Sequence, residues 1–200
     1  MGFKHNVILD ATSTPALHWL SLPYLYAPED AGTPGILDAE DLCQDLDGIA
    51  AVLAWDEPSS TFVEHLCGDP SPFALEQGIG VGIRLEPVRH LFAPLSGSHD
   101  DGFAYSIPPS GGSQLTWLSV PNHVRIPEKL GDSRVTAEDL CRQIGETEVL
   151  AIVRWSRDDG AYEAYGCDSV FHEPFQLVRG EAYGVVNRTN QTIDWLPIHY

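Results

Sequence analysis

The chain has 200 residues, a formal net charge of −18 and 43% hydrophobic residues, including five tryptophans. This apolar content excludes an intrinsically disordered chain, and the length suits one large domain or two domains of about 100 residues each. So acidic a surface repels the phosphates of DNA and RNA, and no apolar run reaches the roughly 18 residues of a membrane-spanning helix. We therefore expect neither a nucleic-acid partner nor a membrane span.

An internal duplication dominates the sequence. Trp19–Pro23 (WLSLP) returns as Trp117–Pro121 (WLSVP), and Ala39–Cys43 (AEDLC) returns as Ala137–Cys141, both 98 residues later. Later matches lie 100 to 102 residues apart, so the copies differ only by small insertions, and we call matching residues twins. Each copy is one folding unit. The predicted organisation is repeat 1 at 1–90, a linker at 91–101 and repeat 2 at 102–200.

Each copy predicts the same elements in the same order. A short apolar strand (6–9 and 104–107) precedes the Trp-containing strand, in which large residues alternate up to a final proline. One helix follows, at 38–47 in repeat 1 and at 136–144 in repeat 2. Each helix has an Asp or Thr N-cap residue, an acidic first turn and a glycine after its last turn, and this pattern fixes both of its ends.

The second half of each copy predicts strands joined by a hairpin. Residues 49–55 and 149–155 are almost continuously apolar, which is typical of strands buried on both faces. A polar turn joins each to an alternating return strand, and a Gly-spaced strand closes the copy. The predicted fold class is α+β, mostly antiparallel β, as two tandem homologous domains that each contain a small sheet with one short helix.

Four cysteines occupy twin positions: Cys43, Cys67, Cys141 and Cys167. Their spacings of 24 and 26 residues are too wide for a CxxC redox or zinc motif. The simplest interpretation is one disulfide within each repeat, Cys43 with Cys67 and Cys141 with Cys167, because a bridge inherited by duplication lies inside the unit. Four buried free thiols are the alternative.

Disulfides would place the protein in an oxidising location, outside the cell or on a virion-like particle. The N-terminal residues lead into a polar stretch without the apolar region of a signal peptide, so the export route stays open.

Four tryptophans form twin pairs, which predicts packing in the core or between the repeats. The fifth, Trp195, has no twin and lies in an apolar tail at 193–200. We predict that Trp195, Leu196 and Ile198 of this tail, with Tyr24 and Tyr26 of repeat 1, contact a partner. The alternative is that the tail is simply the last strand of repeat 2.

Together these features resemble a tandem repeat of bacterial cell-surface and secreted proteins. Its outline is a Trp-x-Leu-Ser-Leu-Pro strand, a short Ala-x-Asp-Leu helix, an aromatic hairpin and a closing Gly-x-Gly-Tyr strand. The resemblance covers Trp19 to Leu85 and Trp117 to Val186, although 78–82 lacks the Tyr and 180–184 lacks the second Gly. It implies a structural or adhesive module in an exported context, without catalytic activity.

Catalytic and metal-binding patterns are missing from the sequence. None of the eight histidines recurs in the other copy, and none has HxH or HExxH spacing. His65 lies two residues before Cys67, but Tyr165 takes its place before Cys167, which favours a structural role over an activated thiol. We therefore expect no enzymatic activity, cofactor or metal.

The predicted function is that of a non-enzymatic structural protein, a subunit or decoration module of an extracellular or particle-like assembly. Its partner would be protein, as a homo-oligomer or in a larger assembly. A ligand-binding module, for carbohydrate or adhesion, is the alternative.

Overall fold

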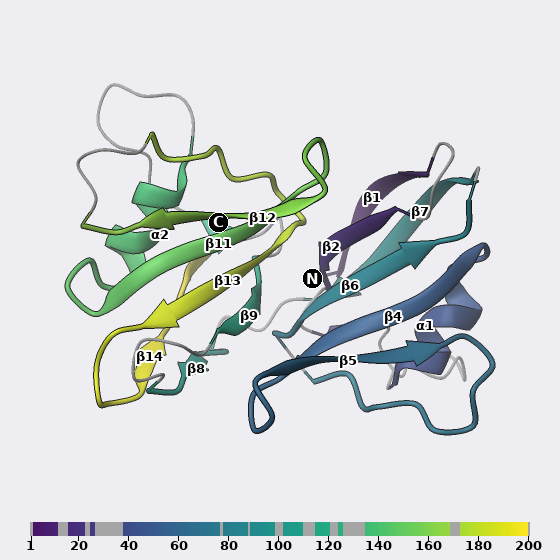
Figure 1. The fold of residues 1–200 in the computed structure, drawn as a ribbon, viewed down its shortest axis with the longest axis horizontal. Coiled ribbons are helices and arrows are strands. Elements are labelled where there is room, and N and C mark those ends of the chain that lie inside the picture. The colour runs from purple at the N-terminus through teal and green to yellow at the C-terminus, as the bar shows by residue number, and fades with distance from the viewer. Residues whose placement is uncertain are drawn as a thin grey trace.

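The structure is a computed structural model of the chain. It describes residues 2–11, 16–22, 25–26, 38–76, 78–87, 89–98, 102–109, 115–120, 124–125, 135–168 and 173–199. Two similar four-stranded antiparallel sheets lie side by side, and each has one helix on one of its faces (Figure 1). The mostly antiparallel α+β fold with two tandem domains is therefore confirmed.

The described part of repeat 1 contains eight elements in chain order. They are β1 (Gly2–Ala11), β2 (Leu17–Ser21), β3 (Leu25–Tyr26), α1 (Ala39–Asp45), β4 (Ile49–Asp56), β5 (Thr61–Leu66), β6 (Gly80–Leu85) and β7 (Arg89–Ser98). The four-stranded sheet has the order β2-β6-β4-β5, and a smaller sheet has the order β1-β7-β3.

Repeat 2 contains the same elements, with one strand divided. They are β8 (Tyr105–Ile107), β9 (Thr116–Ser119), β10 (Val124–Arg125), α2 (Ala137–Ile144), β11 (Val149–Ser156), β12 (Ala161–Gly166), β13 (Ala182–Asn187), β14 (Ile193–Trp195) and β15 (Ile198–His199). The order β9-β13-β11-β12 is that of repeat 1, and β8 pairs with β14 as β10 pairs with β15.

Capping boxes start both helices, as their sequences predict. The Asp38 carboxylate accepts hydrogen bonds from the backbone N–H groups of Glu40 and Asp41, each at 2.9 Å. In α2 the Asp139 carboxylate accepts from the backbone N–H of Thr136 at 2.9 Å. These bonds satisfy N–H groups that have no partner inside the helix and so fix where it begins.

Each helix closes one face of its sheet and forms the core of its repeat. The buried twins Leu42 and Leu140 point from α1 and α2 toward β4 and β11, with Val52 and Ile152 fully buried beneath them. The sequence predicts strands buried on both faces, and this holds only in part: four of the eight residues of β4 and three of the eight of β11 are buried, the others are half-buried, and Leu150 is exposed. A side chain this deep releases about 1.5–3 kcal/mol on burial, so these positions stabilise each repeat separately.

The predicted linker is largely a strand. β7 pairs with β1 over ten residues, from Gly2 opposite Ser98 to Ala11 opposite Arg89, so residues 91–98 belong to repeat 1. Pro, Ser and Gly residues within 94–98 favour a loop in the sequence. The segment is extended here because its backbone groups bond to β1 along its length and to β3 at its end.

The C-terminal tail is the twin of β7. Ile193 lies opposite Ile107, as Leu91 lies opposite Leu9, and Ile198–His199 pair with β10 as the end of β7 pairs with β3. The tail is therefore the last strand of repeat 2, interrupted at 196–197, which is the alternative that the sequence left open.

Candidate functional site: the junction of the two repeats

Twin aromatic residues meet at the junction of the repeats. The Trp19 and Trp117 rings stack with centroids 4.4 Å apart and planes 9° apart, and Phe62 stacks on its twin Tyr162 at 5.9 Å. Because each ring meets its own twin, the repeats are related by an approximate two-fold axis. This arrangement confirms inter-repeat packing for the paired tryptophans.

The serine of the repeated WLS motif joins the backbones at the same junction. Ser21 N–H donates to the Gly180 carbonyl, and its twin Ser119 donates to the Gly78 carbonyl, both at 2.8 Å. Their hydroxyls are buried and also donate across the junction, Ser21 to Glu181 O at 2.6 Å and Ser119 to Leu22 O at 2.8 Å. These hydroxyls therefore have a structural role rather than that of a hydrolase nucleophile.

Close approach at the junction explains two glycines of the closing strand. A Cβ on Gly80 would lie 2.4 Å from the Cβ of its twin Ala182, so one of the two positions must lack a side chain. A Cβ on Gly82 would lie 3.1 Å from Leu53 Cβ and 3.3 Å from the Trp19 ring. Gly80 thus allows the two closing strands to approach each other, and Gly82 leaves room for the Trp19 ring.

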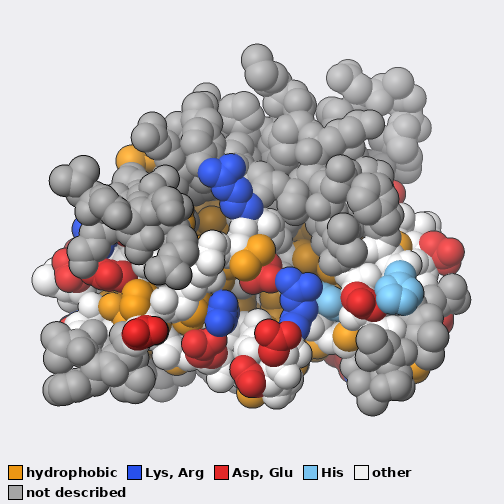
Figure 2. Space-filling view, turned by 90° about the horizontal axis from the view of Figure 1, so that it is seen from above, with side chains coloured by type: hydrophobic (Ala, Val, Ile, Leu, Met, Phe, Trp, Pro, Cys, Tyr) orange, Lys and Arg blue, Asp and Glu red, His pale blue; other side chains and the backbone are white. Residues whose placement is uncertain are grey.

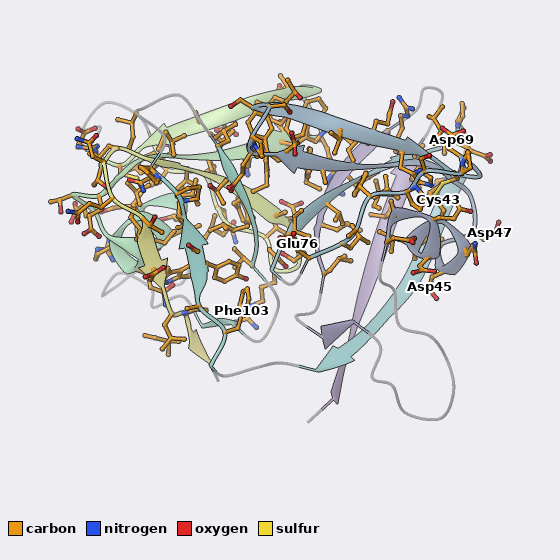
Figure 3. All side chains as sticks on the ribbon, turned by 90° about the horizontal axis from the view of Figure 1, so that it is seen from below. Cys43, Asp45, Asp47, Asp69, Glu76 and Phe103 are labelled. Atoms are coloured by element: carbon orange, nitrogen blue, oxygen red, sulfur yellow. A yellow bond between two sulfur atoms is a disulfide. The ribbon has the colours of Figure 1, made fainter. Side chains whose placement is uncertain are left out.

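A cavity of about 600 Å³ opens beside the junction on one side. Repeat 1 lines it with the end of β4, the following turn, Val63 and residues within 73–76 and 78–79, and repeat 2 lines it with 103–106 and 116–118. Figure 3 shows Glu76 between the two repeats and Phe103 on the repeat 2 side of this region. The Phe103 ring lies over Gly78, where a Cβ would come within 2.6 Å of it. A volume of this size suits a small organic ligand.

The cavity carries negative charge. Burial raises the pKa of Glu57, the nearby Glu76 and Asp56 carboxylates raise it further, and a hydrogen bond from the Thr116 hydroxyl opposes both. Among the described residues, no Lys, Arg or His pairs with Glu57 or Glu76. Glu57 is half-buried and Glu76 is exposed, and a positive charge placed between them would relieve their mutual repulsion.

The position related by the approximate two-fold axis holds an internal ion pair. Arg157, the twin of Glu57, contacts Glu181 with Nη2 2.7 Å from Oε1. His18, the twin of Thr116, is buried with its Nε2 3.0 Å from the Asp10 carbonyl oxygen. Burial lowers the pKa of His18 below its ordinary value, outweighing the hydrogen bond to the Asp10 carbonyl, which raises it, and the charge of Arg157 lowers it as well, so His18 is neutral at pH 7 beside this arginine.

One face of the molecule is mixed in charge. Figure 2 views the side opposite to Figure 3, where Lys and Arg side chains are interspersed with Asp and Glu. Arg142, Arg154, Arg157 and Arg188 each form an ion pair with a carboxylate of the protein. The whole chain nevertheless carries a formal net charge of −18.

Both predicted disulfides are present, Cys43–Cys67 and Cys141–Cys167, with Cα atoms 5.6 and 5.7 Å apart. Beside the first, the His65 Nε2 and the Gly68 N–H each lie 2.8 Å from the Glu40 Oε2. Ligand atoms of Glu40, Cys43 and His65 lie within 4.8 Å of one another. The Cys43 sulfur is bonded to Cys67, however, and a metal needs the free thiolate, so this cluster holds the turn after β5 rather than a metal.

The predicted partner-contact residues fall into three groups. Trp195 is only 3% exposed and stacks on Tyr105 at 5.0 Å, so this prediction is corrected: its indole belongs to the core of repeat 2, because β14 takes the place of β7. Leu196 and Ile198 are 58% and 50% exposed and stay candidates for partner contact. Tyr24 lies outside the described residues, and Tyr26 belongs to β3 with its side chain outside the described part.

Sequence analysis missed the residues of the cavity. Glu57, Glu76 and Phe103 belong to no motif, and the available signal was the charge reversal between the twins Glu57 and Arg157. Comparison with known proteins finds no matching protein family, curated protein or solved structure. No helix among the described residues is long and apolar enough to cross a membrane.

Proposed function

We propose that the protein is a non-enzymatic structural module, a subunit or decoration of an extracellular or particle-like assembly. One observation carries this proposal: the motif residues kept in both copies serve folding and the joining of the repeats. Trp19 stacks on Trp117, Ser21 and Ser119 bond across the junction, and the twin cysteines close each repeat. A body cross-linked by two disulfides and bonded across its repeats suits a building block, as does the resemblance to bacterial surface repeats.

Two disulfides support an oxidising location, because they persist outside the reducing cytosol. Export is tested by expressing the chain in an oxidising and in a reducing compartment. We expect a folded protein with no free thiols from the former, measured by alkylation and mass spectrometry. Equal yield of folded, fully reduced protein from the cytosol would contradict the location.

Self-assembly through the tail is the partner contact that exposure supports. Leu196 and Ile198 are large apolar residues that lie exposed near each other in sequence. Native mass spectrometry and electron microscopy of the purified protein should show a defined oligomer or filament. The variant Leu196→Ser with Ile198→Ser should weaken it, while Leu66→Ser, an exposed leucine of repeat 1, should not. A monomer at all concentrations would contradict the proposed self-assembly.

A ligand-binding module is the second candidate, favoured by the cavity at the junction. The cavity combines apolar walls with the carboxylates of Glu57 and Glu76, which is the composition of many small-molecule sites. Calorimetric titration with small charged and neutral compounds tests this function separately from assembly.

A further inference from the structure

We propose that the cavity at the repeat junction binds a guanidinium group, held over Phe73 and neutralised by Glu57 and Glu76. This inference rests on the second candidate function and names its ligand class. The approximate two-fold symmetry of the molecule supplies the argument, because repeat 2 contains the same position with a guanidinium already in it.

In repeat 2 that guanidinium belongs to Arg154. Its central carbon lies 4.6 Å from the centroid of the Phe175 ring. Its Nε and Nη2 each lie 2.7 Å from the Glu163 carboxylate, and Nη1 donates to the Gln176 carbonyl at 3.3 Å. An aromatic face, a carboxylate and a carbonyl thus surround the cation, which is the usual setting for a bound guanidinium.

In repeat 1 smaller, uncharged residues stand at the same position. The twins of Arg154, Glu163 and Gln176 are Ala54, Val63 and Ala74, and Phe73 is the twin of Phe175. The registers agree, since Ala54 lies opposite Val63 as Arg154 lies opposite Glu163. All four repeat 1 residues line the cavity. The ring is kept while the arginine that covers it in repeat 2 is absent.

Repeat 1 has carboxylates near this position, but on other residues than repeat 2. Val63 replaces the carboxylate of Glu163, but Glu57 and Glu76 also line the cavity, where their twins are Arg157 and Val178. Repeat 2 thus places two arginines around this position, and repeat 1 places two carboxylates. Among the described residues no cation pairs with either carboxylate, so both can accept hydrogen bonds from an external cation.

The carboxylates and the aromatic ring that line the cavity indicate which chemical group it binds. Carboxylates bind a guanidinium in a fixed plane through paired N–H donors, while its flat face stacks on an aromatic ring. A neutral ligand of the same shape would leave both carboxylates without a counter-charge. The guanidinium is supplied either by a free small molecule or by an arginine side chain of a partner protein.

Calorimetry with 1-butylguanidinium and its neutral isostere 1-butylurea tests the proposal on the full chain. We expect saturable binding of the cation, at least about tenfold tighter than that of the urea, which corresponds to about 1.4 kcal/mol. Glu57→Gln and Glu76→Gln should each weaken binding of the cation about tenfold or more, and Glu146→Gln, an exposed acid beyond the cavity, should leave it unchanged.

The decisive variant is Ala54→Arg, which supplies the group from the chain itself. Its guanidinium should cover Phe73 as Arg154 covers Phe175, so the variant should fold with an unchanged melting temperature or a higher one and should lose cation binding. Ala54→Leu controls for filling with an apolar side chain. A folded Ala54→Arg variant that binds butylguanidinium as the wild type does would overturn the proposal.

Further results of the calorimetry also test the guanidinium proposal. Equal binding of butylguanidinium and butylurea would overturn the cationic class but keep a ligand-binding cavity, and no saturable binding of any probe would overturn both. Neither result touches assembly, which native mass spectrometry measures independently. Tighter binding of the peptide acetyl-Gly-Arg-Gly-amide than of butylguanidinium would support an arginine of a partner protein, and the reverse order would support a free small molecule.

Discussion

The two repeats share one fold but differ in the charged residues beside the hairpin of the four-stranded sheet. Repeat 2 places Arg154 and Arg157 there, each 2.7 Å from a carboxylate of its own repeat. Repeat 1 has Ala54 and Glu57 at these positions and a cavity instead. What both copies keep supports folding and the junction, whereas what one copy alone has forms the candidate site.

A second difference lies in the edge strand that completes each repeat. Repeat 1 uses the ten residues of β7, and repeat 2 uses the short β14 and β15, with the side chain of Trp195 at the end of β14 buried in the core. We expect the burial of this one large indole to offset the shorter backbone pairing. Repeat 2 therefore depends more on a few tail residues than repeat 1 depends on any few residues of β7.

Deleting residues 193–200 should have the largest effect of the variants considered. Ile193 and Trp195 are buried and would each lose about 1.5–3 kcal/mol, and β8 would lose its only pairing partner in its sheet among the described residues. We expect repeat 2 to lose its cooperative melting transition, followed by calorimetry. The full-length Leu196→Ser variant should melt within about 0.5 kcal/mol of wild type. A normal transition in the truncated protein would contradict the equivalence of the tail and β7.

Removing either disulfide should cost about 3 kcal/mol, because each closes a loop of similar length in the unfolded chain. The repeats should differ in reduction rate. Cys141 and Cys167 are buried, whereas Cys43 and Cys67 are partly exposed, and thiol exchange needs access to sulfur. Timed alkylation with peptide mapping should therefore find the repeat 1 bridge reduced first. Simultaneous reduction of both bridges would contradict this difference.

Gly80→Ala should destabilise the protein by about 1–3 kcal/mol, since its Cβ would lie 2.4 Å from the Cβ of Ala182. The backbone at Gly80 is an ordinary strand, so the loss would come from the contact and not from strain. Ala182→Gly in the same chain should restore most of the stability in chemical denaturation. If the double variant were no more stable than Gly80→Ala, the close approach of the twins would be wrong.

The smallest predicted effect concerns pH. Burial holds the pKa of His18 below its ordinary value of 6.5, so the unfolded chain binds this proton more readily than the folded chain does. Stability due to neutral His18 is present above pH 6.5 and is lost as pH falls below it. His18→Thr, which introduces the twin residue Thr116, should flatten the dependence of the unfolding free energy on pH between about 6.5 and 5. An unchanged slope would show that His18 does not titrate differently on folding.

Local features of the fold were predictable from sequence because their causes are local. The capping boxes at Asp38 and Thr136 place the helices through bonds between residues three positions apart. The disulfide pairing follows from duplication, since Cys43 and Cys141 are twins inside homologous units. Both inferences need only short segments or a comparison of the copies.

The sequence by itself determined two α+β repeats, their helices, their main strands and their disulfides. The tertiary structure decided that Trp19 meets Trp117, that 91–98 is a strand and that Trp195 is buried, because each depends on which distant backbone or face lies opposite. It also decided the cavity. Comparison of the copies shows Ala54 where repeat 2 has Arg154, but only the tertiary structure shows that Ala54 lines one cavity with Phe73, Glu57 and Glu76.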